Sequence, residues 1–272
     1  MAKKSFVEKA YTTRRGRFLL NLMFYTGALK LAGLWVRSPF SRPMVEKFIK
    51  KNNIDMTPYG ERTFKSFAEF FIRQKEYTFD PASETLISPC DGCLSAYRVS
   101  KDARFTVKGR EYAVSDLLTD DALASRFEGG LCLVYRLRET DYHRFCFIED
   151  GEQGKNVFVK GKLHSVQPVA LEKEPVYRVN RRLWTTFKTD HFGLVGQCAV
   201  GAVLVGGMVY EKENARVKKG AEMGRFELRG STIVQFFEKD RIDLLPCFED
   251  ATLENEREVS IGQAVGTRRH YE

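Results

Sequence analysis

The stretch GRFELRGSTIVQFF, residues 224–237, ends in a run of β-branched and aromatic side chains. Such a run from Ile233 to Phe237 predicts a strand. The step Gly230-Ser231-Thr232 leads directly into it, and glycine allows the bent or left-handed backbone that a turn needs. A plain turn before a strand is one interpretation of this step. A second interpretation is chemical, because a hydroxyl held against the preceding carbonyl can attack it.

The chain from residue 81 onward is a β-rich unit of the same kind. Short β-branched and aromatic runs alternate with glycine and aspartate turns, which predicts an antiparallel, sandwich-like core rather than βαβ units. One intervening helix is expected at 115–127, with Ser115 as its N-cap. The expected strands are Leu86–Ile87, Leu94–Val99, Phe105–Val107, Leu131–Leu137, Asn156–Val159, Arg182–Lys188, a glycine-broken run Val195–Tyr210, and Ser231–Phe237.

The amino-terminal part is helical and basic. Residues 1–51 contain twelve Lys and Arg against two Glu, a charge of +10, whereas the whole chain carries +8. We therefore expect an α+β fold with a basic, helical, membrane-associating region at 1–80 and a β-rich catalytic domain at 81–272. Helices are predicted at 14–37, 44–51 and 64–72, broken at Ser38-Pro39 and Arg42-Pro43, with Ser66 as the N-cap of the last.

The predicted helix at 14–37 is apolar nearly all round, so it must be buried in the protein core or at a membrane interface. Its longest run without Asn or Lys, 22–29, is short for a transmembrane helix. No small-residue cleavage site of a signal peptide follows it. Flanking arginines and Trp35 favour the membrane interface, and the basic charge suits an anionic lipid surface. The basic residues form no nucleic-acid-binding motif, so no nucleic acid partner is expected.

The cysteines, one turn and two histidines are the other candidate sites. Cys90 and Cys93 form the one C-x-x-C pair among six cysteines, so a structural zinc site is not expected and the thiols are expected to be reduced. Residues 88–92, SPCDG, predict a hairpin turn. His143 follows a predicted strand, and an imidazole can move protons near neutral pH, although a purely structural histidine is the alternative. His191 is expected to lie in a turn.

Four short motifs occur together: Pro-x-Asp-Gly at 89–92, Asp-Tyr-His-Arg at 141–144, Val-Gly-Ala at 200–202 and Gly-Ser-Thr at 230–232. In this order they resemble the phosphatidylserine decarboxylase proenzymes. The resemblance implies that the chain cuts itself between Gly230 and Ser231, and that Ser231 becomes an N-terminal pyruvoyl group, the covalent cofactor. That group would turn phosphatidylserine into phosphatidylethanolamine by accepting the electrons left as CO₂ departs.

The resemblance also implies roles for other residues. His143 is tied to the decarboxylation step, and Asp91 is the residue that orients and charges a general base. This chain departs from the pattern at Cys146, where many members carry a second histidine. His164 is the preferred replacement base for activating Ser231. Cys146 with a depressed thiol pKa, or His143 serving both steps, are the other options.

The expected partners are phosphatidylserine, an anionic membrane surface and the second fragment of the cleaved chain, with a homodimer as a further option. We expect a peripheral protein on the cytoplasmic face of the cell membrane. Three alternatives stay open at this point. They are a pyruvoyl decarboxylase of a soluble amino acid, a non-processing membrane-binding relative, and a thiol hydrolase that uses Cys146 with His143.

Overall fold

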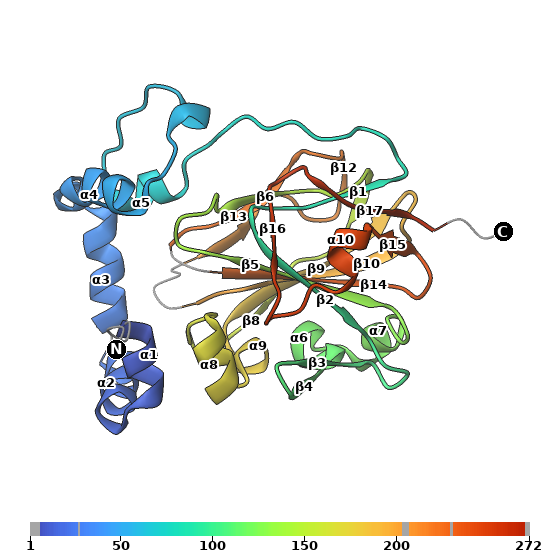
Figure 1. The fold of residues 1–272 in the computed structure, drawn as a ribbon, viewed down its shortest axis with the longest axis horizontal. Coiled ribbons are helices and arrows are strands. Elements are labelled where there is room, and N and C mark those ends of the chain that lie inside the picture. Colours follow the sequence, from blue (N-terminus) through green and yellow to red (C-terminus); the bar gives the residue numbers. More distant parts are fainter. Residues whose placement is uncertain (1–5, 27, 203–206, 229–230, 270–272) are drawn as a thin grey trace.

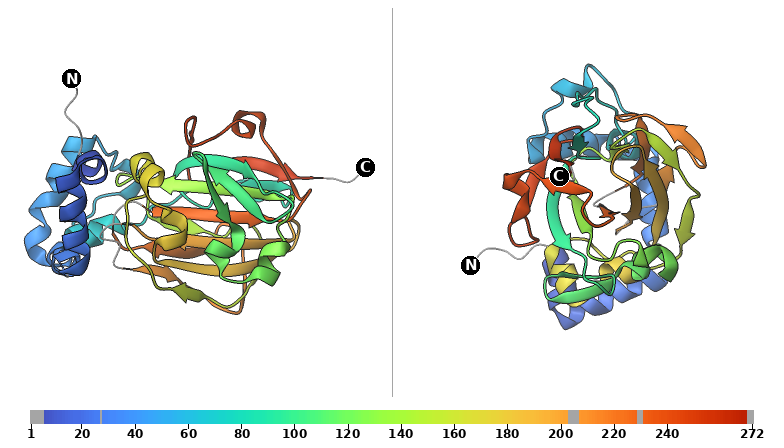
Figure 2. Two further views of the ribbon diagram at one scale, coloured as in Figure 1. Left: turned by 90° about the horizontal axis from the view of Figure 1, so that it is seen from below. Right: turned by 90° about the vertical axis from the view of Figure 1, so that its right-hand side faces the viewer.

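The computed structural model describes residues 6–26, 28–202, 207–228 and 231–269. Its helical and β-rich parts are arranged side by side: an arm of helices lies beside a β-rich body (Figure 1), and a second view places the arm at one end of that body (Figure 2). This confirms the α+β class. The arm contains α1 (Phe6–Thr12), α2 (Arg14–Tyr25), α3 (Ala28–Arg37), the 3₁₀ turn η1 (Pro39–Ser41), α4 (Pro43–Asn52), η2 (Thr57–Tyr59) and α5 (Phe67–Phe71).

The single helix predicted at 14–37 is in fact two, so that prediction was wrong. Thr13 caps α2, since its hydroxyl accepts a hydrogen bond from Gly16 N at 3.0 Å. Thr26 ends α2, and its N–H and hydroxyl both donate to the Leu22 carbonyl, at 2.9 and 2.8 Å. The two proline breaks are confirmed, because η1 and α4 each begin at a proline. The Ser66 cap is confirmed as well, with Glu69 N at 3.2 Å from its hydroxyl.

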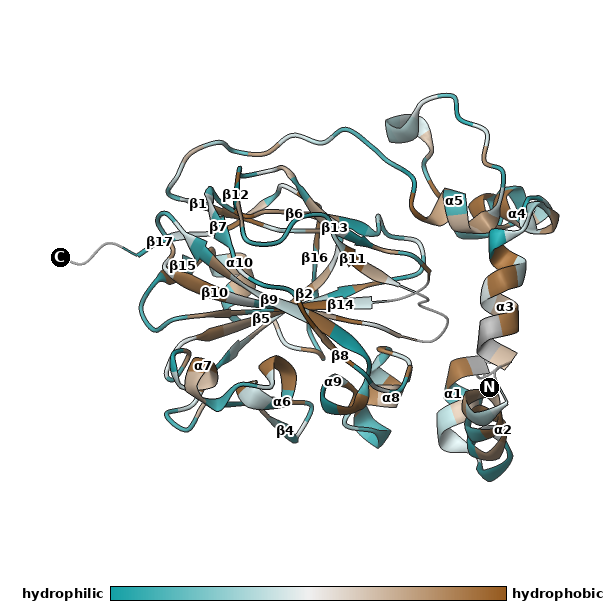
Figure 3. Cartoon of the chain, turned by 180° about the vertical axis from the view of Figure 1, so that it is seen from behind, coloured by the Kyte–Doolittle hydropathy of each residue, from teal (hydrophilic) through white to brown (hydrophobic). Residues whose placement is uncertain are grey.

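Helices α2 and α3 expose apolar side chains to solvent. Hydrophobic stretches follow both helices in Figure 3. In the part of the chain that the structure describes, no helix is both long enough and apolar enough to cross a membrane. The large apolar side chains left exposed on the arm are Phe18, Leu19, Leu22, Tyr25, Leu31, Leu34, Trp35 and Phe40.

The body is built on one nine-stranded sheet whose middle strand is β14. The sheet runs in the order β12-β7-β9-β10-β14-β5-β2-β16, with β8 also paired to β9. Every pairing in it is antiparallel. The strands are β2 (Gly92–Arg98), β5 (Leu131–Leu137), β7 (Gly151–Gln153), β8 (Val157–Val159), β9 (Arg182–Thr189), β10 (Leu194–Val200), β12 (Ala215–Val217), β14 (Ser231–Phe237) and β16 (Arg257–Val259).

Smaller sheets and short helices cover both faces of this large sheet. On one face, Phe236 of β14 packs against Phe105 and Phe127, whose ring centroids lie 5.5 and 5.9 Å from that of Phe236. The other face packs toward the β11-β13-β6 sheet, where Phe147 contacts Phe187 at 5.4 Å. The remaining elements are β1 (Thr85–Ile87), β3 (Arg104–Val107), β4 (Arg110–Ala113), β6 (Arg144–Cys146), β11 (Met208–Tyr210), β13 (Glu222–Phe226), β15 (Ile242–Leu244), β17 (Ala264–Arg268), α6 (Val114–Leu118), α7 (Asp121–Ser125), α8 (Pro168–Lys173), α9 (Val176–Val179) and α10 (Pro246–Glu249).

Two local predictions in the body were wrong. The helix expected at 115–127 is split into α6 and α7, because Thr119 between them adopts a left-handed φ of 51° that ends a helix. Ser115 lies inside α6, and the cap with a side-chain bond is Asp120, which accepts from Leu123 N at 2.9 Å. The turn at 88–92 is not a hairpin. It connects β1, which pairs with β17, to β2, which pairs with β5 and β16.

Candidate active site

Ser231 is the first residue of β14, and the sheet fixes it from both sides. It lies across from Leu137 at the end of β5, while Thr232 lies across from Val200 at the end of β10. Ser231 is fully buried, and strand alternation places it on the face that packs toward the β11-β13-β6 sheet. Gly230, the other half of the expected cleavage site, lies outside the described residues.

His143 is fully buried and held in one tautomer. Its Nδ1 lies 2.8 Å from the Asp141 carbonyl oxygen, and because a carbonyl only accepts, Nδ1 carries the hydrogen. The lone pair is therefore on Nε2, which is buried and has no hydrogen-bond partner among the described atoms. Burial, together with the charge of Arg73, lowers the pKa of His143 to about 3. The imidazole is neutral at physiological pH, and Nε2 can accept a proton.

The chain that leads to Ser231 passes directly beside His143. The Phe226 N–H donates to the His143 carbonyl at 2.9 Å. The same ladder continues through β13 and β6, with Arg225 across from Arg144. The structure thus brings His143 to a point five residues before Ser231, although the two lie far apart in sequence.

Asp91 makes two hydrogen bonds, and neither goes to an imidazole. Its Oδ2 accepts from Lys75 Nζ at 2.6 Å, and its Oδ1 accepts from the Ile261 N–H at 2.8 Å. The pair of Asp91 and Lys75 is mostly shielded from solvent, with 18% and 15% of the side chains exposed. The role of Asp91 in orienting a base stays a prediction, and the structure adds Lys75 as its direct partner.

His164 lies next to the strand end that carries Ser231, but its ring contacts the helical arm. Its N–H donates to Asn180 Oδ1, and Asn180 Nδ2 in turn donates to the Gly201 carbonyl at 2.7 Å. The Tyr11 hydroxyl accepts from Ser165 N at 2.9 Å and also lies 3.2 Å from His164 Nδ1, where either group can be the donor, depending on the tautomer of the ring. Like Nε2 of His143, Nε2 of His164 is buried and has no hydrogen-bond partner among the described atoms. Burial lowers the pKa of His164.

Cys146 is fully buried at the end of β6. Its N–H donates to the Pro89 carbonyl at 2.8 Å, which ties β6 to the Pro-x-Asp-Gly segment. Burial raises the pKa of the Cys146 thiol to about 12, although the Tyr77 hydroxyl beside it acts in the opposite direction. The thiol therefore stays protonated, which disfavours both options that need a Cys146 thiolate.

Arg73 is a site residue that the motif analysis did not identify. Arg73 is 3% exposed, and its guanidinium lies 4.7 Å from the Tyr59 ring centroid and donates to the Phe70 and Thr140 carbonyls at 3.3 and 3.0 Å. Within the described residues it forms no ion pair with a carboxylate, and its charge lowers the pKa of His143. The sequence could have pointed to Arg73 through its position, since a charged residue just after an aromatic helix is expected to share the buried surroundings of that helix.

A cavity of about 250 Å³ lies where the arm meets the end of β5. The arm contributes apolar side chains of α1 and α2, and the body contributes Leu137, the residue paired with Ser231. Arg136 and Arg138 also line it, but both are paired to carboxylates, Arg136 to Glu256 and Arg138 to Asp141 and Glu258. An apolar cavity with charged groups at one side suits an amphiphilic molecule.

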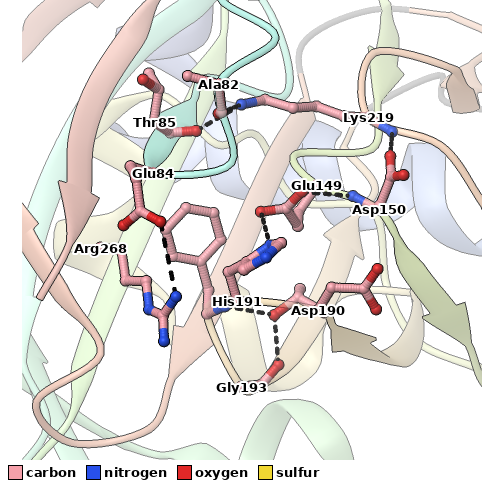
Figure 4. A network of polar contacts seen from close by, with 12 residues as sticks. Ala82, Glu84, Thr85, Glu149, Asp150, Asp190, His191, Gly193, Lys219 and Arg268 are labelled. Carbon is pink, nitrogen blue, oxygen red and sulfur yellow. Dashed lines mark hydrogen bonds and ion pairs between the residues drawn. The ribbon is translucent and has the colours of Figure 1, made fainter. Parts of the chain in front are cut away.

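His191 belongs to a separate network at the other end of β10 (Figure 4). Its Nδ1 lies 3.2 Å from Oε2 of the buried Glu149. Lys219 of the same network donates through Nζ to the Ala82 and Thr85 carbonyls. These contacts hold loops together and do not reach β14 at Ser231. In the described ranges, no group of three or more His, Cys, Asp and Glu could hold a metal ion.

Comparison with known proteins identifies the class. The family model described as phosphatidylserine decarboxylase matches residues 64–267, which cover the site and nearly the whole body. The chain is 35% identical to the phosphatidylserine decarboxylase proenzyme of Clostridium beijerinckii, with 98% of this chain and 94% of that protein aligned. It is 38% identical to the proenzyme of Ruminiclostridium cellulolyticum, over 94% of this chain and 89% of that protein.

These matches, together with the buried serine at the start of a central strand, place the protein among the decarboxylases. The chain belongs to the phosphatidylserine decarboxylase family.

Proposed function

We propose that this protein decarboxylates phosphatidylserine with a pyruvoyl group that it makes from Ser231 after cutting itself at Gly230–Ser231. The main observation in support is that Ser231 is buried at the first residue of the middle strand, and that the chain five residues before it hydrogen-bonds to the main chain of His143, a neutral histidine with an unpartnered Nε2. A reactive carbonyl formed there would be shielded from water, so the residues present fit the group. When formed, a pyruvoyl group supplies an electron sink for the departure of CO₂.

His143 is the proposed base for both steps. Because Nδ1 is committed to the Asp141 carbonyl, Nε2 can take the proton of the Ser231 hydroxyl as its oxygen attacks the Gly230 carbonyl, and can return it to the Ser231 nitrogen as the C–N bond breaks to leave an ester. Elimination then frees the Gly230 carboxylate, and water replaces the nitrogen of residue 231, which leaves as ammonia. In the second step, Nε2 can take a proton from the substrate amine and return it to the carbon that loses CO₂. An imidazolium in this buried place, close to Arg73, is unfavourable and gives its proton up readily.

The arm is proposed to bring the site to an anionic membrane. Its exposed apolar side chains on α2 and α3 would enter the interface, while the exposed Arg14 and Arg15 would face lipid phosphates. This location suits a phospholipid substrate better than a soluble amino acid. Peripheral attachment at the cytoplasmic face, and two fragments that remain associated, are part of the same proposal.

The test is the intact mass of the purified protein under denaturing conditions. We expect a fragment 1–230 and a fragment 231–272 that has no free N-terminal amine, and Ser231→Ala should stay uncut. Release of CO₂ should occur from phosphatidylserine vesicles and not from free serine. A wild-type chain that stays intact in the presence of lipid would overturn the proposal and leave a non-processing relative.

A further inference from the structure

The chain crosses between two separate hydrophobic cores just before Ser231. Phe226 belongs to the main core of the body, whereas Leu228, two residues later, belongs to a second cluster formed by the arm. We call this second group the arm cluster; its buried members are Val45, Phe67, Phe70, Phe71 and Leu228. Leu228 is 1% exposed, so the residue shortly before the expected cleavage site is fixed by helices α4 and α5.

Glu227, between the two cores, is held by the arm as well. Its carboxylate forms an ion pair with Arg37 at the end of α3, with 2.8 Å between the nitrogen and Oε2. Its N–H donates to the Gly207 carbonyl at 3.0 Å. A Cβ at Gly207 would come within 2.6 Å of Glu227 Oε2, so glycine at this position makes room for the carboxylate.

The arm cluster also holds His143. The Phe71 ring lies on the imidazole with 3.9 Å between centroids. Phe71 is fully buried and shares the cluster with Leu228. Helix α5 therefore touches both the proposed base and the chain that carries the proposed scissile carbonyl.

We propose that Leu228 and the Arg37–Glu227 ion pair are positioning residues for self-cleavage. This inference rests on the proposed function. Ser231 is already fixed by its pairing with β5, so only the carbonyl side of the bond needs an anchor. Leu228 supplies that anchor in a hydrophobic core, and Glu227 sets the direction of the chain. Attack of a hydroxyl on a carbonyl depends steeply on such placement, and an error of about 1 Å can cost about a hundredfold in rate.

The experiment follows cleavage of freshly translated chain, quenched at intervals and analysed by mass. Leu228→Ala is expected to slow the appearance of fragment 231–272 by more than about tenfold, and Leu228→Met to restore most of the rate. The matched control is Leu118→Ala in α6, an equally buried leucine on the other face of the large sheet. It should lower the melting temperature to a similar extent while leaving the cleavage rate nearly unchanged.

A charge exchange tests the ion pair. Arg37→Glu and Glu227→Arg should each slow cleavage by about threefold, which is the size expected for a partly exposed pair, and the double variant should recover. If Leu228→Ala is cleaved like wild type, or slows no more than Leu118→Ala, the anchor is refuted. A double variant that stays slow refutes the role of the pair. An uncut wild-type chain instead overturns the proposed function, and this inference with it.

Discussion

Burial changes what the imidazole of His143 can do. An exposed histidine is partly charged near neutral pH, whereas the arm covers His143 and Arg73 adds an unfavourable charge, so the ring is neutral and its Nε2 is a proton acceptor. The same burial keeps Cys146 protonated. Of the three candidates for activating Ser231, His143 is the one whose tautomer is fixed by a carbonyl, which leaves the lone pair on Nε2, and whose main chain contacts the segment that leads to Ser231.

His143→Gln is expected to abolish self-cleavage, whereas His164→Gln and Cys146→Ser are expected to be cleaved. The reason is that the ring of His164 contacts Tyr11 of the arm, whereas the main chain of His143 is hydrogen-bonded to the segment that leads to Ser231, and the thiol of Cys146 has a pKa of about 12. Denaturing mass measurement of the purified variants checks this. His191→Gln, at the other end of β10, is the control and should be cleaved normally. Full processing of the His143 variant would contradict the assignment.

The depressed pKa of His143 also predicts how stability depends on pH. The unfolded chain takes up a proton near pH 6.5, but the folded chain does so only near pH 3. Between these values the unfolded state binds more protons, so stability falls as pH falls, by up to about 1.4 kcal/mol per pH unit for this group. Above pH 6.5 the neutral ring makes its full contribution to the free energy of unfolding.

Urea unfolding between pH 7 and pH 4 measures that slope. His143→Phe, which cannot be protonated, should lose less stability on acidification than wild type. His164, whose pKa burial also lowers, should contribute in the same direction, and His191 provides a comparison with a half-exposed histidine. Equal slopes in the His143 variant and wild type would show that the folded protein protonates this ring normally.

At the scale of elements, β13 delivers the chain to Ser231, and it depends on a glycine. A Cβ at Gly224 would lie 2.1 Å from the Val209 carbonyl oxygen and 2.7 Å from a Phe145 ring carbon. Both neighbours are held by their own sheet pairings, so neither can move away at low cost. The close approach of β11, β13 and β6 therefore requires glycine at this position.

Gly224→Ala is expected to destabilise the protein by about 1–3 kcal/mol, the typical cost of overpacking, and to slow cleavage because β13 is displaced. Gly33→Ala in α3 is the matched control. A Cβ there meets only an Arg37 side-chain nitrogen at 3.6 Å, an ordinary contact, and alanine favours a helix by about 1 kcal/mol. Thermal melting of both variants should move in opposite directions. A Gly224→Ala variant with an unchanged melting temperature would contradict the close approach of these strands.

At the scale of the whole molecule, the arm has one surface that packs against the body and one that faces solvent. Its inner surface forms the arm cluster and the cavity beside Leu137. Its outer surface leaves large apolar side chains in solvent, such as Leu31, which is 69% exposed, and Leu34, which is 65% exposed. An apolar patch of this kind on a basic region supports the proposed membrane interaction.

Leu31→Glu with Leu34→Glu is expected to weaken binding to anionic vesicles by at least about tenfold, because two charges replace buried apolar area at the interface. Cosedimentation with vesicles containing phosphatidylserine measures it. Phe158→Glu is the control, since Phe158 is 53% exposed but lies on β8 of the body. If the double variant binds vesicles as strongly as wild type, the arm is not the membrane-binding surface, and a soluble substrate is favoured.

The two expected fragments should remain together without denaturant. The carboxyl-terminal fragment contributes β14, which pairs with both β5 and β10, as well as β16 and β17, which pair with β2 and β1. Separation requires breaking the middle of the large sheet and exposing its core. Gel filtration of processed protein should give one peak that contains both fragments. Dissociation in plain buffer would contradict this.

The sequence by itself determined the elements with strong local patterns. The runs at 131–137 and 231–237 are strands with the predicted bounds, because most of their residues are apolar or β-branched and can be buried on both faces. The proline breaks and the Ser66 cap follow from backbone geometry within a few residues. The short strands β6, β7 and β12 were missed, since three residues with mixed polarity have no recognisable period.

Only the tertiary structure decided the chemistry of the site. Asp91 pairs with Lys75, His164 with Tyr11, and Arg73 influences His143, and each of these pairs joins segments that no local rule connects. The protonation states follow from burial, which depends on the complete fold. The sequence contained the motifs for decarboxylation. The protonation states of the candidate bases depend on the packing of the arm against the body, because that packing fixes both desolvation and hydrogen-bond partners.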